Sequence, residues 1–112
     1  MKVLVVDFSE ANNIVELFPR GLELLVEKKD GGRAYKIAGE EMPDIIIINY
    51  KDKPSHGWQT AISIKERKKT SHIPIYFVDG NEGVMDKVNQ LGIRVDMNEL
   101  VSLLESKINA NA

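Results

Sequence analysis

Three polar residues stand directly behind apolar runs of the sequence. Asp7 follows "VLVV", Asn49 follows "IIII" and Asp79 follows "IYFV". Carboxylate and amide oxygens are ligands that a hard metal ion such as Mg²⁺ prefers, and a carboxylate can also act as a nucleophile. These residues form one site only if the segments that carry them are neighbouring strands of one sheet.

The composition is that of a single soluble globular domain covering residues 1–112. Hydrophobic residues make up 43% of the chain and charged residues 29%, and the length allows one core. The net charge of −2 argues against general nucleic-acid or membrane-surface binding. There is no cysteine, no apolar run near the roughly 20 residues of a membrane span, and no signal peptide. A cytoplasmic location is expected.

Short apolar runs alternate with longer amphipathic segments along the chain. The runs are at residues 3–6, 22–26, 45–48 and 73–78, with a weaker fifth at 93–95. Several are continuous rather than alternating and rich in Val and Ile. That pattern is typical of parallel strands buried on both faces of a sheet.

Five segments of helical length accompany these runs. Ser9 is expected to cap the first, Asp30 precedes the second and Asn98 opens the fifth. Apolar residues mark the first, third and fourth helices: Ile14, Leu17 and Phe18; Trp58, Ala61 and Ile64; Val84, Val88 and Leu91. The alternation predicts a doubly wound α/β sandwich. Among the topologies that right-handed crossovers permit, we expect the flavodoxin-like one, with five helices around a parallel sheet of strand order 2-1-3-4-5.

In such a sheet the ligand crevice lies beyond the carboxyl ends of the strands, where the winding reverses. Asp7, Asn49 and Asp79 end the first, third and fourth expected strands. We therefore expect these three side chains to converge.

With these residues in place, the whole chain resembles the receiver domain of bacterial two-component response regulators, a CheY-like module of signal transduction. The resemblance depends on the order and spacing of four stretches: "KVLVVDFSE", "GLELLVEKKDGGRAYKIAGEEMPDIIII", "GWQTAISIKER" and "IPIYFVDG". Receivers accept a phosphoryl group on an aspartate with the help of Mg²⁺. A hydroxyl residue and a lysine then couple phosphorylation to a change of shape.

Transferred to this chain, the resemblance implies a degenerate phosphoacceptor site. The acceptor position falls on Asn49, whose amide lacks the nucleophilic oxygen of a carboxylate. Of the acidic pair after the first strand Asp7 remains, but its neighbour is Phe8, and Asp79 stands at the Ser/Thr position. The Lys-Pro pair is missing from "GIRVDMNEL". The resemblance thus implies a pseudo-receiver with no catalysis and no cofactor.

Without the family lysine, Asp7 and Asp79 would face one another with no counter-charge, at a cost that grows with burial. Lys51 and Lys53 follow Asn49 closely in the sequence and could reach the crevice. We expect one of them, Lys53 by its spacing, to supply the missing positive charge.

Two other readings stay open. Asp7 and Asp79 could bind Mg²⁺ in a PIN-like or NYN-like nuclease, whose acidic loops "VVDFSEANN" and "VDGNEG" faintly resemble. Such sites usually need three or four carboxylates, and Asn49 removes the third; loop or capping roles for both aspartates are commoner. The basic run "KERKK" at residues 65–69 is typical of a solvated helix end, and we expect no nucleic-acid binding.

The expected function is that of a stand-alone pseudo-receiver that acts through a protein partner or by self-association. In receivers the fourth helix, fifth strand and fifth helix commonly carry such contacts. In the last helical segment, Leu103 lies outside the arc expected to face the sheet. Together with Val95 and Met97 it is the candidate partner surface. The alternative is that the preceding helix covers Leu103.

Overall fold

Five parallel strands form one sheet in the computed structural model, which describes residues 1–10, 13–78 and 85–110, without the side chains of 85–87. The strands are β1 (Lys2–Asp7), β2 (Glu23–Lys28), β3 (Ile45–Asn49), β4 (Ile75–Val78) and β5 (Ile93–Val95). Their order is β2-β1-β3-β4-β5. This confirms the fold class and the strand order expected from the sequence.

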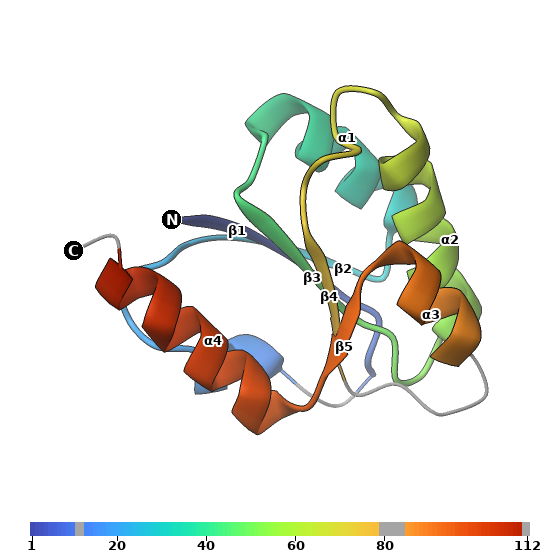
Figure 1. Cartoon of the computed structure of the whole chain (residues 1–112). Helices are drawn as coiled ribbons and strands as arrows, with labels where there is room; N and C mark the ends of the chain where they lie inside the picture. The colour runs from blue at the N-terminus through green and yellow to red at the C-terminus, as the bar shows by residue number, and fades with distance from the viewer. Residues whose placement is uncertain (11–12, 79–84, 111–112) are drawn as a thin grey trace.

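The helices lie in two unequal layers on either side of the sheet (Figure 1). One face is covered by α1 (Gly31–Glu41), α2 (Pro54–Glu66) and α3 (Met85–Leu91); the other carries α4 (Met97–Ala110) and the 3-10 helix η1 (Ile14–Leu17). Each face has its own core, which we name by its helices. The α1–α3 core includes Leu4, Val6, Phe8, Ile46 and Phe77. The α4 core includes Val3, Val5, Ile14, Leu100 and Leu104. In the described parts of the chain, no helix is long and apolar enough to cross a membrane.

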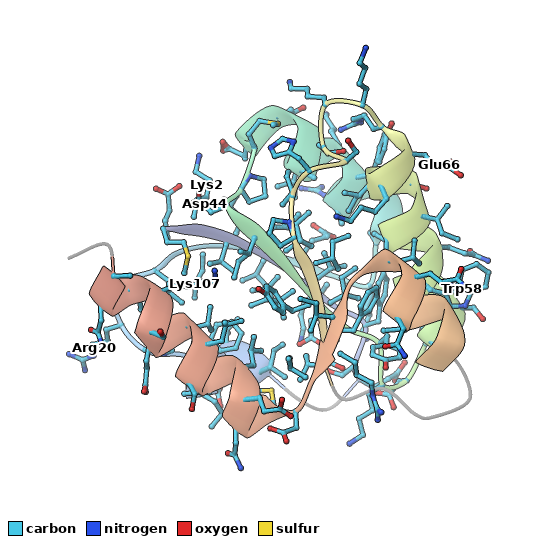
Figure 2. All side chains as sticks on the ribbon, in the orientation of Figure 1. Lys2, Arg20, Asp44, Trp58, Glu66 and Lys107 are labelled. Atoms are coloured by element: carbon cyan, nitrogen blue, oxygen red, sulfur yellow. The ribbon has the colours of Figure 1, made fainter. Side chains whose placement is uncertain are left out.

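The central strand β3 explains the run of four isoleucines. All its residues are buried, because β1 and β4 pair with its two edges and helices cover both faces. Ile46 and Ile48 point into the α1–α3 core, and Ile45 and Ile47 into the α4 core. Asp44, just before β3, fixes its start beside β1: the Lys2 N–H donates to Asp44 Oδ2 at 2.7 Å, and Figure 2 shows the two residues side by side.

Polar side chains begin two of the helices. Asp30 caps α1 as expected, and its carboxylate accepts from the Arg33 N–H at 3.0 Å. At α4 the capping residue is Asp96 rather than Asn98. Asp96 accepts from the Glu99 N–H at 2.8 Å, and Glu99 accepts in return from the Asp96 N–H at 3.2 Å. The bond from the Glu99 N–H is the main reason that the pKa of Asp96 lies below its usual value.

The prediction of a first α-helix capped by Ser9 is wrong. The only helical part of the described β1–β2 connection is the single turn η1, and the structure has four α-helices rather than five within the described ranges. Ser9 does not cap it, because the Ser9 hydroxyl donates to Asp7 Oδ1 at 2.6 Å. Ile14 is buried, whereas Leu17 is 61% exposed. The side-chain bond of Ser9 competes with helix capping, and Pro19, four residues after Val15, prevents the helix from continuing. The segment between them is too short for a longer helix.

The approach of α2 to β3 depends on Gly57. A Cβ atom at this position would lie 2.5 Å from the Cβ of Tyr50 and 3.4 Å from Cγ2 of Ile48. Both partners are fully buried, so neither has room to move away. The glycine therefore sets how closely the helix packs on the sheet.

We expect Gly57→Ala to lower the free energy of unfolding by about 1–3 kcal/mol, because the strain of overpacking outweighs the better helix propensity of alanine. Chemical denaturation measures this change. Gly39→Ala in α1 is the matched control, since its Cβ would meet the flexible guanidinium of Arg67 rather than a core side chain. A larger loss of unfolding free energy for Gly39→Ala than for Gly57→Ala would contradict the role of Gly57 in the packing of α2 on the sheet.

Candidate functional site

Asp7 and Asn49 lie side by side at the carboxyl end of the sheet. They end β1 and β3, which are adjacent, and the strand register pairs the two residues directly. Both are buried, with exposures of 1% and 0%. Asp79, the third expected member, comes directly after β4 in the sequence and lies outside the described residues. The described part of the site thus consists of one carboxylate and one amide.

The Asp7 carboxylate is held by hydrogen bonds and one ion pair. Oδ1 accepts from the Ser9 N–H at 2.9 Å and from the Ser9 hydroxyl at 2.6 Å. Oδ2 lies 3.8 Å from Nζ of Lys28, at the end of the neighbouring strand β2. Both oxygens are therefore engaged by groups of the chain itself, which compensates for much of the cost of burying the charge.

Only one of the two polar side-chain atoms of Asn49 has a hydrogen-bond partner among the described residues. Its Oδ1 accepts from the Lys51 N–H at 3.1 Å, which closes a tight turn after β3. Its Nδ2 is buried and has no hydrogen-bond partner among the described residues. A buried polar group left in this state costs about 1–3 kcal/mol. The position therefore carries an energetic cost that an apolar core residue would not.

Phe8 is a core residue. Its side chain is fully buried in the α1–α3 core, and its ring centroid lies 5.9 Å from that of His56 in a tilted contact. Its ring also lies near Gly31, at the beginning of α1. Phe8 thus stabilises the packing of α1 and α2 on the sheet.

The counter-charge of Asp7 is Lys28, not Lys53 or Lys51 as expected from the sequence. Neither of these two lysines forms an ion pair with a carboxylate in the described structure, and Lys51 is exposed. Lys51 instead contacts the site through its backbone N–H, which donates to Asn49 Oδ1. The signal that could have identified Lys28 is the strand register, because a residue at the end of β2 lies beside the residue at the end of β1.

The described residues of this site do not fit the magnesium ion that phosphorylatable receivers use. The Asp7 oxygens already bind a serine and a lysine, and the neighbouring amide turns an unpartnered N–H donor into the protein interior. Mg²⁺ requires several oxygen ligands in near-octahedral geometry. Among the described residues there is no group of three or more His, Asp or Glu that could hold a metal ion.

A second polar residue of this region was missed by sequence reasoning. Tyr50, next to Asn49, is fully buried, and its ring meets that of Phe77 edge-on at 5.5 Å. Burial raises the pKa of Tyr50, and the nearby positive charge of Arg94 counteracts part of that rise. The hydroxyl has no partner in hydrogen-bonding geometry within the described structure. Tyr50 fills the space above Gly57 and acts in packing.

The three residues of the candidate partner surface are brought together but are not exposed as a patch. Val95, Met97 and Leu103 are all half-buried and pack against the α4 core. The large apolar side chain exposed in this region is Ile93, at 55%. Leu103 is thus covered in part, as the alternative reading of the sequence allowed, through its packing against the α4 core.

We expect Lys28→Met to lower the free energy of unfolding by up to about 1 kcal/mol, because it removes the cation beside a buried carboxylate. Lys53→Met is the matched control and should leave stability unchanged. Urea denaturation of both variants measures the difference. A greater loss for Lys53→Met would restore the counter-charge role that the sequence suggested.

Comparison with known proteins shows similarity at the level of fold. No protein-family model and no curated protein matches the sequence. A receiver domain of a sensor histidine kinase from Pseudomonas aeruginosa, solved with magnesium in its active-site cleft, aligns with a TM-score of 0.73 and 18% identity over 96% of this chain and 97% of that one.

Two further solved structures agree. The N-terminal domain of a response regulator receiver protein from Methanoculleus marisnigri gives a TM-score of 0.65 and 20% identity, covering 94% of each chain. A LuxR-family response regulator from Aurantimonas gives 0.71 and 22%, covering 97% of this chain and 85% of that one. The chain therefore has the fold of a response-regulator receiver domain.

Proposed function

We propose that this protein is a pseudo-receiver: a signalling module with the receiver fold that is not phosphorylated at the end of β3 and acts by binding another protein. The observation that carries the proposal is Asn49. It occupies the end of the central strand, fully buried, where receivers have the acceptor aspartate. A neutral amide cannot form the acyl phosphate through which receivers are switched.

The surroundings of Asn49 support the same conclusion. In a working receiver the charges at this site are left for a metal ion and a phosphoryl group. Here Asp7 is neutralised within the chain by Lys28. The loops after β1 and β3 are also joined directly, since the Glu10 N–H donates to Asp52 Oδ2 at 2.6 Å. These contacts join the loops around the crevice through groups of the chain itself.

A protein that has no switch chemistry of its own must exert its effect through contacts. The surface proposed for a partner is that of α3, β5 and α4, which corresponds to the fourth helix, fifth strand and fifth helix of receivers. Ile93 is the exposed apolar residue of β5 and, by the pairing of β5 with β4, lies on the side of the sheet that carries α4. It takes the role that the sequence assigned to Leu103. Cytoplasmic location stays a prediction.

Acetyl phosphate should leave the protein unmodified, because the chain offers no carboxylate at the acceptor position. Intact-mass spectrometry after incubation with acetyl phosphate and Mg²⁺ measures this, with a phosphorylatable receiver as the positive control. A labile mass increase by one phosphoryl group would refute the proposal. The same mass increase lost in Asn49→Ala would place the modification at this site.

Ile93→Glu should leave the melting temperature nearly unchanged, because the side chain is more than half exposed. It should weaken capture of the partner protein from a lysate. Leu103→Glu is the matched comparison: it places a charge against the α4 core and should lower the melting temperature by several degrees. Unchanged capture by Ile93→Glu would exclude this surface.

A further inference from the structure

The strand β2 forms an open edge of the sheet. It pairs only with β1 among the described residues, and its other side faces outward. An exposed strand edge is a row of free N–H and C=O groups that can pair with another chain. Proteins usually protect such edges with short strands, charges, proline or a covering helix.

Two apolar side chains remain uncovered on this strand. Leu24 is 36% exposed and Val26 is 44% exposed. The register pairs them with Val3 and Val5, so they lie on the same face of the sheet as the α4 core. The single turn η1 stands on this face where the sequence predicted a full helix. The apolar surface of β2 on this side is therefore incompletely covered.

The backbone of the same two residues is also available. The Glu23 N–H donates to Met1 O and the Lys29 N–H donates to Asp7 O, so every second residue of β2 turns its polar groups inward to β1. The alternate residues Leu24, Val26 and Lys28 turn theirs outward. Their free groups are centred on Val26, which is where the symmetry axis of a two-fold antiparallel pairing of this strand would lie.

The charges along β2 distinguish between two registers of this pairing, one with the two-fold axis at Leu25 and one with the axis at Val26. Centred on Leu25, the pairing would place Glu23 opposite Glu27 of a second copy, and the same unfavourable pair would occur twice. Centred on Val26, it brings Glu23 close to Lys29 of the second copy, twice; Lys29 lies one residue beyond β2, in a bend with a φ of 70°, and its long side chain reaches toward Glu23. All of these charged residues except the half-buried Glu27 are exposed, and Glu27 is already bound to Arg33 at 3.3 Å. Opposite charges across strands stabilise the pairing and like charges oppose it.

We propose that β2 pairs with β2 of a second copy of this chain, antiparallel and with the two-fold axis at Val26, so that the two sheets become continuous. The contact is isologous, with each Leu24 under the aliphatic stem of the other copy's Lys28. The Lys28 ammonium stays with Asp7. This interface is separate from the surface of α3, β5 and α4, and it does not rest on the absence of phosphorylation.

Sedimentation velocity of the whole chain over a range of concentrations tests the proposal. The wild-type protein should sediment as a dimer in equilibrium with monomer. Val26→Lys should abolish the dimer, because it places two ammonium groups at the axis, while the exposed position leaves the melting temperature nearly unchanged. Ile93→Lys, at the opposite edge of the sheet, is the matched control and should leave the dimer intact. A monomeric wild type, or a dimer lost in Ile93→Lys and kept in Val26→Lys, would overturn the proposal.

A charge exchange tests the register. Glu23→Lys and Lys29→Glu should each weaken the dimer about tenfold, since each replaces two attractions between opposite charges across the interface by two repulsions. The double variant Glu23→Lys with Lys29→Glu should return to within about threefold of the wild-type dissociation constant, because the pairs are then restored with opposite sign. A double variant as weak as either single variant would exclude the pairing centred on Val26.

Discussion

Burial of β3 on both faces is the constraint on which the rest of the structure depends. A strand with pairing partners on both edges and helices on both sides must be apolar throughout, and the four isoleucines satisfy that requirement. The strand delivers its last side chain to the crevice with no exposure to solvent. A polar side chain at this position therefore depends on the protein itself for its hydrogen bonds. Asn49 receives one and lacks another.

The residues at the carboxyl ends of the central strands have structural roles in this chain. Phe8 packs in the α1–α3 core, and Asp7 binds Ser9 and Lys28. The result is a set of local contacts that link the ends of β1, β2 and β3.

Much of the fold could be predicted from the sequence, because continuous Val and Ile runs mark buried parallel strands and Asp30 marks a helix start. The same reasoning placed Asp7 and Asn49 together, since both end such runs. It failed where the outcome depends on contacts between distant segments. Lys28 becomes the partner of Asp7 only through the register of β1 and β2, and Ser9 is drawn from its expected capping role by the same carboxylate. Helical periodicity likewise placed Leu103 outside the buried arc, but packing against the α4 core covers it in part.

The short connection between β1 and β2 has a consequence for the order in which the sheet assembles. Lys2 pairs with Glu23, whereas Val3 pairs with Ile45, so the contacts between β1 and β2 close a chain loop about half as long as those between β1 and β3. Shorter loops cost less entropy to close and form faster. The outer strand is thus favoured to join β1 early, before the centre of the sheet is complete. An apolar strand edge is then exposed while much of the chain is still unfolded. In such a state a higher protein concentration favours aggregation over correct folding.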